Sequence, residues 1–299
     1  MFLNLFNQLP VGLRYMLMST LGFALMSVCV KAVSAHGIPV FEIVAARALI
    51  SLLLSTIDIR RKKLSVWGHN KPLLIARGTA GTIALMGAYY AVTTLPLAEA
   101  TVIQYLHPVF TALLALLFLK ESIRRSNLIC ILLSLLGLAI MVQPGMDSEI
   151  AHNLPTISII AALVGAFGSA VAYVLVRRLS QSEDSSVIIF YFPLISLPLS
   201  LMLLGNDFVM PTPWTLALLI LVGIFTQIGQ IGLTHAMKTD NAAKATAYSY
   251  IQVIFSVALG WILFDEIPVL TTVIGGGLIM CGAVINVFGG RGIRGSRET

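Results

Sequence analysis

The sequence predicts an all-α integral membrane protein with ten transmembrane helices, which form two inverted five-helix repeats and leave both chain ends in the cytoplasm. Of its 299 residues, 58% are hydrophobic and only 11% are charged, a composition that excludes a water-soluble fold. Apolar stretches of about 20 residues recur along the whole chain, and each is long enough to cross a ~30 Å hydrocarbon core as a helix. The chain also matches itself at a fixed offset, and its basic residues gather on one side of the predicted helices.

The ten predicted helices follow one another along the chain. The first reaches full length close to the N-terminus and has no small-residue cleavage site behind a short apolar core, so we expect it to be its own targeting signal and not a cleaved signal peptide. The expected limits of the ten are 13–34, 38–57, 73–94, 98–119, 126–143, 156–176, 186–204, 214–236, 243–264 and 269–288.

The basic residues set the predicted orientation. With the N-terminus in the cytoplasm, all 19 Lys and Arg residues except Lys31 and Arg47 fall on the cytoplasmic side, as the positive-inside tendency requires. This distribution predicts an N-in, C-in, multi-pass protein of the cytoplasmic (inner) membrane. The net charge of +6 is therefore an orientation signal, and we expect no nucleic-acid partner because the chain lacks a soluble basic face.

A shift of 145 residues aligns one half of the chain with the other. The segment "LISLLLS" at 49–55 meets "LISLPLS" at 194–200, and Thr101, Tyr105 and Glu121 meet Thr246, Tyr250 and Glu266. Residues 1–147 are therefore expected to form the first five-helix repeat and residues 148–299 the second. Because five is an odd number, the two copies must cross the membrane in opposite directions, a plan typical of secondary transporters with a substrate site near the midplane.

Polar residues form a stripe on the fourth predicted helix and again on its copy, the ninth. Spacings of three and four place the members of each stripe on one helix face. Hydrogen bonds between helices would explain single Ser and Thr residues, but several Gln and His residues on matched faces favour a shared aqueous cavity. The stripes are Thr101, Gln104, His107 and Thr111 on the fourth helix, Thr246, Ser249, Gln252 and Ser256 on the ninth, and Gln227, Gln230 and Thr234 on the eighth.

The candidate substrate-binding residues come from these stripes, from tyrosines at the same depth and from one arginine. Arg47 lies about ten residues into the second helix, where a cation costs at least ~2.5 kcal/mol and should face the interior or water. A structural pair with a carbonyl or an acid elsewhere is the alternative for Arg47. The Gln and His side chains would supply hydrogen bonds, and the tyrosines would supply stacking or hydroxyl contacts. The complete set is Arg47, Tyr90, Gln104, Tyr105, His107, Gln227, Gln230, Tyr248, Tyr250 and Gln252.

Pro108 is the candidate gating residue. It lies in the middle of the fourth helix, where it removes one backbone hydrogen bond and frees the carbonyl near Gln104. A kink there would serve a gate, or it would be a static bend of the kind that membrane helices tolerate.

Arg77 and the glycines of the fifth and tenth helices are expected to serve structure. Arg77 opens the third helix on the cytoplasmic side, where the plain interpretation is an orientation anchor. Gly137, Gly275, Gly276, Gly277 and Gly282 suit close helix packing and the contacts of a homodimer.

The chain resembles the EamA branch of the drug/metabolite transporter superfamily. The residues that carry the resemblance are "PLAEATVIQYLHPVFTALLALLFLKE" at 96–121, its weaker copy "NAAKATAYSYIQVIFSVALGWILFDE" at 241–266, Arg47, and "RG" at 77–78. The resemblance implies a central cavity built by the third, fourth, eighth and ninth helices. The second copy departs from the pattern because Val253 stands where the first copy has Pro108.

The sequence thus predicts a secondary active transporter that exports small polar or zwitterionic metabolites, such as amino acids or their derivatives, by alternating access. The alternatives are an uptake carrier or exchanger for S-adenosylmethionine or another metabolite, and a passive small-solute channel. We expect no enzyme activity, because no HExxH motif and no nucleophile paired with a base lies at membrane depth. No cofactor or metal is expected, since the three cysteines fall inside predicted spans without metal-ligand spacing. The expected partners are a small-molecule substrate, the lipid bilayer, the proton as candidate coupling ion and a second copy of the chain.

Overall fold

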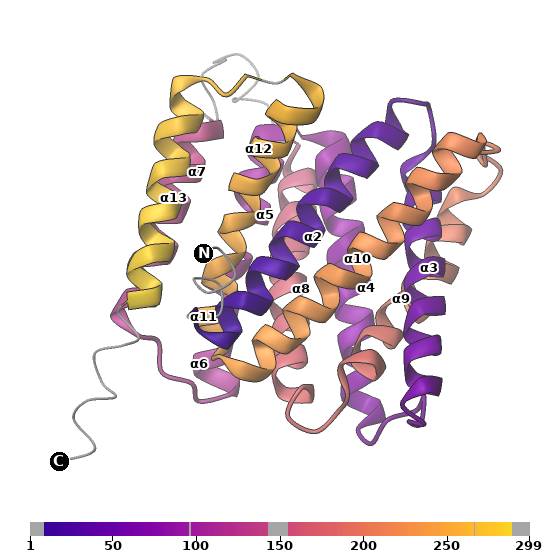
Figure 1. The fold of residues 1–299 in the computed structure, drawn as a ribbon, viewed down its shortest axis with the longest axis horizontal. Helices are drawn as coiled ribbons and strands as arrows, with labels where there is room; N and C mark the ends of the chain where they lie inside the picture. Colours follow the sequence, from indigo (N-terminus) through magenta and orange to yellow (C-terminus); the bar gives the residue numbers. More distant parts are fainter. Residues whose placement is uncertain (1–8, 96, 143–154, 266, 289–299) are drawn as a thin grey trace.

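The computed structural model describes residues 9–95, 97–142, 155–265 and 267–288, and every regular element in those ranges is helical. Figure 1 shows the arrangement of these helices. They are α2 (Val11–Ser34), α3 (Val40–Arg61), α4 (Lys71–Thr94), α5 (Leu97–Gln104), α6 (His107–Phe118), α7 (Arg125–Val142), α8 (Thr156–Leu179), α9 (Ser185–Leu204), α10 (Pro213–Thr239), α11 (Ala242–Ala247), the 3-10 turn η2 (Tyr248–Tyr250), α12 (Ile251–Phe264) and α13 (Leu270–Phe288).

Nine helical segments within the described ranges are long and apolar enough to cross a membrane, and they correspond to nine of the ten predicted stretches. The tenth stretch, 73–94, corresponds to α4, which has 24 residues and is therefore long enough to span. It is missing from the nine because it carries Arg77, several glycines and threonines, and two tyrosines. Of these residues, Arg77 and Gly81 line the cavity described below.

The surface of the helical bundle is apolar and its interior is partly polar. Leu117, Phe118 and Ile262 each expose about 70% of their side chains, whereas Ser134 and Ser196 are completely buried. A water-soluble domain shows the opposite distribution for such large apolar side chains. The exposed apolar belt is what lipid contact requires.

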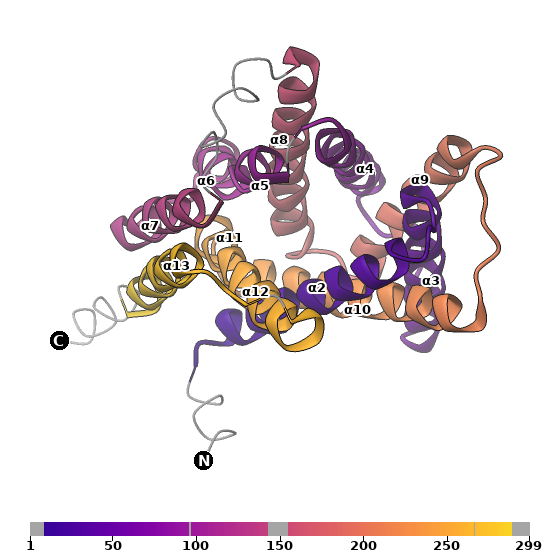
Figure 2. The same cartoon turned by 90° about the horizontal axis from the view of Figure 1, so that it is seen from above.

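The helices form two rows that are joined at both ends, as the view from above shows (Figure 2). One row contains α2, α10 and α12, and the other contains α4, α6 and α8. The pairs α3–α9 and α7–α13 close the two ends. The four most extensive pairs, α2–α10, α4–α8, α3–α9 and α7–α13, each join one helix from the first half to one from the second.

The contacts between helices repeat at the 145-residue offset. Under that offset α2 corresponds to α8 and α4 corresponds to α10, so the pair α2–α10 becomes α8–α4, which is also present. The pairs α3–α10 and α2–α12 likewise become α9–α4 and α8–α6. Two five-helix halves therefore pack with an internal two-fold relation. The predicted boundary at 147/148 lies outside the described residues, and the N-in, C-in orientation stays a prediction.

The fourth and ninth predicted helices correspond to the spans Ala100–Phe118 and Ala242–Phe264, and each span is interrupted at overlapping positions of the repeat. The fourth changes direction between α5 and α6 at Tyr105 and Leu106, and the ninth forms the tighter turn η2 at Tyr248–Tyr250, between α11 and α12. Pro108 lies in the first turn of α6, where its missing N–H costs nothing because that group has no intrahelical partner. The second copy turns at the matching place without a proline, so Pro108 alone does not cause the interruption.

The glycines of α7 and α13 bring these two helices together within the chain. A Cβ atom on Gly137 would collide with the carbonyl oxygen of Gly275, and a Cβ atom on Gly275 would collide with that of Gly137. Gly282 approaches Cys130 in the same interface. The structure therefore uses these glycines in intrachain packing, and the homodimer stays a prediction.

Candidate functional site

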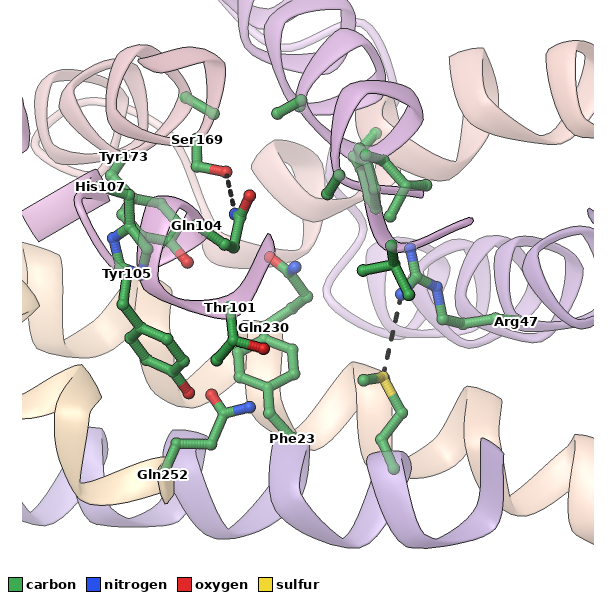
Figure 3. Close-up of a pocket in the computed structure, with 18 of the residues that line it drawn as sticks. Phe23, Arg47, Thr101, Gln104, Tyr105, His107, Ser169, Tyr173, Gln230 and Gln252 are labelled. Atoms are coloured by element: carbon green, nitrogen blue, oxygen red, sulfur yellow. Dashed lines mark hydrogen bonds between the residues drawn. The ribbon is translucent and has the colours of Figure 1, made fainter. Parts of the chain in front are cut away.

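A cavity of about 390 Å³ lies between the two rows of helices (Figure 3). Its walls come from α2, α3, α4, α5, α6, α8, α9, α10 and α12, so both halves of the chain contribute. The resemblance implied only the third, fourth, eighth and ninth helices, and the structure adds the first, second, sixth and seventh. The polar lining residues are Arg47, Arg77, Thr101, Gln104, Tyr105, His107, Ser169, Tyr173, Gln230 and Gln252.

The cavity extends toward one end of the bundle. Along α4 its lining runs from Arg77 to Val92, and it continues onto Ala100 and Thr101 at the start of α5. It therefore reaches the end at which α4 finishes and α5 begins. In the predicted orientation this is the outer side of the membrane.

At the opposite end of the bundle, polar contacts join loops of the two halves. The carboxylate of Glu183, 6% exposed, accepts hydrogen bonds from the backbone N–H groups of His69 (2.6 Å) and Asn70 (2.7 Å). The Lys62 ammonium bonds to the carboxylate of Asp184 at 3.0 Å. These contacts join the connection 62–70 of the first half to the connection 180–184 of the second, and we call them the closing network.

The ion pair of the closing network shifts the pKa values of both partners. Burial opposes charge on Lys62, but hydrogen bonds to Asp58 and Asp184 outweigh it and raise the pKa of Lys62 above 10.5. Burial likewise opposes charge on Asp184, yet hydrogen bonds from Ser186 and Lys62 lower the pKa of Asp184 below 3.8. Both groups are therefore charged over the whole physiological range of pH.

Arg77 is the most deeply buried cation in the cavity wall. It lies six residues into α4 and is only 3% exposed. Its Nη2 donates a hydrogen bond to Oε1 of Gln230 at 3.0 Å, which joins α4 to α10. Its Nε and Nη1 atoms have no hydrogen-bond partner within the described part of the chain. Position 77 therefore supplies a buried guanidinium with donors to spare.

Arg47 reaches the same space from α3. Its guanidinium carbon lies 5.8 Å from the centre of the Phe192 ring, and that of Arg77 lies 5.0 Å from the same centre. Its Nη1 makes a weak polar contact with the sulfur of Met26 at 3.9 Å (Figure 3). Two cations therefore lie beside one aromatic ring of α9.

Amide groups from three helices face the cavity. Figure 3 shows Gln104, Gln230 and Gln252 directed into it from α5, α10 and α12. Nε2 of Gln104 donates to the hydroxyl of Ser169 at 3.3 Å, and its Oε1 is buried without a partner in the described residues. His107 packs edge-on against Tyr173 with ring centres 5.2 Å apart. The wall can thus both donate and accept hydrogen bonds.

No carboxylate belongs to the described lining of this cavity. The carboxylate of Glu42, on the same helix as Arg47, accepts a hydrogen bond from the backbone N–H of Val209 at 2.9 Å instead. Among the residues described, no group of three or more His, Cys, Asp or Glu side chains is placed to hold a metal ion. The side-chain charges that line the space are therefore positive.

Six of the ten candidate residues line the cavity: Arg47, Gln104, Tyr105, His107, Gln230 and Gln252. The other four lie elsewhere. Tyr90 is 47% exposed on the outside of α4, and Tyr248 is completely buried in the main apolar core. Gln227 accepts a hydrogen bond from Ser51 (2.6 Å) and donates one to Ser55 (3.0 Å), so it fastens α10 to α3.

Tyr250 packs against Tyr105, which lines the cavity, but does not line the cavity itself. Its ring stacks on the ring of Tyr105 with centres 5.7 Å apart, and its hydroxyl donates to the backbone carbonyl of Tyr105 at 2.8 Å. The predicted gating residue, Pro108, is buried next to the interruption between α5 and α6. Tyr250 and Pro108 thus shape the interruption and do not face the cavity.

Sequence reasoning missed Arg77, Phe192, Tyr173 and Phe23 as wall residues. Arg77 was predicted to be an anchor at the membrane surface, but α4 begins at Lys71, so Arg77 lies roughly 9 Å inside the helix. The sequence signal that could have identified Arg77 is the same as for Arg47, because each is a cation within an apolar stretch. The aromatic residues carried no signal of their own, because apolar rings occur throughout the chain.

Comparison with known proteins gives matches over nearly the whole chain. The EamA-like transporter family matches residues 10–143 and 156–288. The pseudopaline exporter of Pseudomonas aeruginosa is 30% identical, over 93% of this chain and 96% of its own length. Solute carrier family 35 member G1 of Homo sapiens is also 30% identical, over 90% of this chain and 76% of its own. A solved crystal structure has the same fold, with a TM-score of 0.82, 19% identity and coverage of 94% of this chain and 97% of its own.

Proposed function

This chain belongs to the EamA-like transporter family, and from that premise we propose that it is a secondary carrier that moves a small polar metabolite through the cavity by alternating access. It is a multi-pass membrane transporter and not an enzyme. The observation that supports the mechanism is the cavity itself, which has polar walls from both halves and extends toward one end of the bundle. In our proposal the closing network closes the other end. A carrier needs such a site with access from one side at a time.

The packing bears on which parts move. Inverted repeats suggest that one sequence half rocks against the other. Such a motion would separate all four of the most extensive helix pairs, since each joins the two halves. The rows α2–α10–α12 and α4–α6–α8 each keep their own contacts and meet across the cavity. In our proposal these rows, each with helices from both halves, are the bodies that rock.

A carboxylate-bearing substrate suits the wall. Arg47 and Arg77 supply positive charge, and the amides of Gln104, Gln230 and Gln252 supply hydrogen bonds. Amino acids and their derivatives remain the leading class, as the sequence suggested. The alternative substrate S-adenosylmethionine carries a sulfonium cation, which the positive wall disfavours.

Export is the direction we propose. Its support is the similarity to the pseudopaline exporter of Pseudomonas aeruginosa. The proton stays a candidate coupling ion, because His107 lines the cavity and its side chain can carry a proton. Transport that does not respond to an imposed pH gradient would remove proton coupling from the proposal.

Counterflow in proteoliposomes tests the carrier mechanism. Vesicles with the purified protein are preloaded with one unlabelled compound from a panel of amino acids, S-adenosylmethionine, nucleosides and organic acids, and uptake of the labelled compound is followed. A carrier gives saturable, transient accumulation, whereas a passive channel gives none. Vesicles without protein are the control, and absence of accumulation with every compound would overturn the carrier proposal.

The same assay tests the wall residues. Replacing Gln104 or His107 by Leu is expected to weaken substrate affinity, because each change removes a hydrogen-bonding group from the cavity. Wild-type affinity and rate in both variants would remove these two residues from the site.

A further inference from the structure

We propose that the cavity binds a substrate with two carboxylates and net negative charge, with one carboxylate on Arg77 and the other on Arg47, on the two sides of the space beside Phe192. This inference rests on the proposed function, since it takes the cavity as the transport site. It narrows the carboxylate-bearing substrate of that proposal to a compound with two carboxylates.

Arg77 carries the first part of the argument. A guanidinium that is 3% exposed within a membrane span is costly unless its donors are satisfied. Gln230 satisfies one nitrogen, and Nε and Nη1 remain without a partner in the residues described. Gln230 is neutral, so the positive charge itself is not compensated. An anionic substrate group would supply both the missing hydrogen bonds and the missing charge.

The position of Gly81 supports a binding role for Arg77. Gly81 lies one turn after Arg77 and lines the cavity. A Cβ atom there would lie 3.0 Å from the Phe192 ring and 3.6 Å from Nη1 of Arg77. The absence of a side chain at position 81 therefore keeps the space beside the unpartnered Nη1 atom free.

Arg47 supplies the second positive charge, beside the same aromatic ring as Arg77. Both guanidinium carbons lie within cation–π range of Phe192, at 5.8 Å and 5.0 Å from its centre. They are therefore no farther apart than the sum of those two distances, which a short dicarboxylate can bridge. The aromatic ring attracts each cation weakly and does not neutralise either, so the two like charges repel until anions arrive.

The absence of Asp and Glu from the described lining favours a dianionic substrate over a zwitterionic one. An amino acid would bring an ammonium group, and the lining in the described ranges offers it no carboxylate. Glu42, the acid on the same helix as Arg47, accepts a hydrogen bond from the backbone N–H of Val209 and does not line the cavity. A dianion neutralises both arginines, whereas a zwitterion leaves the cavity with its two positive charges.

Ligand-induced thermal stabilisation of the purified protein tests the charge requirement without relying on transport. The probes are succinate and glutarate as dianions, leucine and serine as zwitterions and lysine as a cation, all at matched ionic strength with chloride as the reference. The dianions are expected to raise the melting temperature and the other probes are not. A shift with leucine or serine but not with the dianions, or no shift with any probe, would overturn the proposal.

Arginine variants assign the effect to the two residues. Arg77→Gln and Arg47→Gln are each expected to weaken succinate binding by about tenfold or more, because each removes one charge-assisted contact. Arg77→Lys keeps the charge and is expected to bind more tightly than Arg77→Gln. Arg61→Gln, at an exposed position at the end of α3, is the matched control and should bind like wild type. Equal binding by Arg77→Gln and wild type would overturn the assignment.

Counterflow with the same probes separates this inference from the carrier proposal. Exchange driven by succinate or glutarate supports both. Exchange driven only by zwitterions keeps the carrier and overturns the dicarboxylate. Stabilisation by dianions that depends on Arg77, with no exchange of any compound, supports the site and overturns the carrier.

Discussion

At the scale of single residues, the position of a side chain around its helix decides whether it binds substrate or holds the fold. Gln227 and Gln230 are three residues apart on α10, which places them roughly 60° apart around the axis. Gln227 turns to Ser51 and Ser55 on α3, whereas Gln230 turns to Arg77 and the cavity. Two residues that form one stripe in the sequence therefore have different tasks.

We predict that Leu substitutions separate these tasks. Gln227→Leu leaves two buried serine hydroxyls unpaired and should lower the stability of the folded protein by about 1 kcal/mol or more, with wild-type affinity in the remaining folded fraction. Gln230→Leu should lower substrate affinity more than stability, because it alters the support of Arg77. Thermal unfolding in detergent and counterflow measure the two effects. Similar losses of affinity in both variants would contradict the division.

Glycine at position 81 is predicted to be required for binding. Gly81→Ala brings a methyl group to 3.0 Å from the Phe192 ring, and such overpacking costs about 1–3 kcal/mol. We expect substrate affinity to fall about tenfold. Gly277→Ala on α13 is the matched control, because a Cβ atom there meets nothing within 4 Å. A Gly81→Ala variant with wild-type affinity would show that the space beside Arg77 is not used.

At the scale of elements, the interrupted helices are a property of both repeats. The interruption between α5 and α6 and the turn η2 fall at matching positions, although only the first copy has a proline. Both interruptions lie beside the cavity, where backbone that leaves the helical pattern is tolerated because it is buried in protein. The repeat therefore conserves the shape of the element without the residue that was expected to cause it.

Pro108→Ala is accordingly predicted to leave the interruption in place. Position 108 is in the first turn of α6, where exchange of Pro for Ala changes stability by less than about 1 kcal/mol. We expect transport close to that of wild type. If Pro108 acted as a gate, the Pro108→Ala variant would lose transport instead. The rate of counterflow at saturating substrate measures the outcome, and a large loss of rate with normal folding would restore the gating hypothesis.

At the scale of the whole molecule, access depends on contacts between loops that are more than 100 residues apart in the sequence. Glu183 binds the backbone of 69–70, and Asp184 pairs with Lys62. At the opposite end, Glu42 bonds to Val209. Among the described residues, both ends of the bundle therefore have a carboxylate that accepts hydrogen bonds from backbone N–H groups, and the Lys62–Asp184 ion pair is added at the end of the closing network.

The pKa shifts predict that the Lys62–Asp184 ion pair of the closing network does not respond to pH near neutrality. Asp184 has a pKa lowered below 3.8, so its contribution is present above that value and is lost as the pH falls through the lowered pKa. Lys62 has a pKa raised above 10.5, so its contribution is present below 10.5 and is lost as the pH rises through the raised pKa. Between about pH 5 and pH 9 this ion pair should contribute a constant amount to closure, because both of its groups stay charged. The contact between Nδ1 of His69 and Oε2 of Glu183, at 3.3 Å, is separate from it.

Spin labels on Ser65 and Gln181, both exposed in the two connections, test this prediction in a variant without cysteines. The distance distribution should not change between about pH 5 and pH 9. Glu183→Gln should broaden it toward longer distances at every pH, because the neutral amide holds the backbone N–H groups of His69 and Asn70 less strongly. A distribution that opens between these pH values in the unmodified network would contradict the assignment of closure to Lys62 and Asp184.

The sequence by itself determined the membrane class, the ten helical stretches, the two related halves and much of the polar wall. These features could be predicted because hydropathy, length and repetition are properties of the chain read in order. Gln104, His107 and Gln252 reach the cavity as predicted from their spacing, since a stripe on a helix face persists whatever the helix packs against.

Only the tertiary structure decided which way each helix is turned and what meets across the bundle. Rotation of α10 about its axis depends on its contacts with α2 and α3, and it sends Gln230, and not Gln227, into the cavity. The burial of Arg77 depends on where α4 begins and on α9, which brings Phe192 beside it. Such relations join residues more than 100 positions apart, and no local pattern encodes them, because they arise from the packing of the helices against one another.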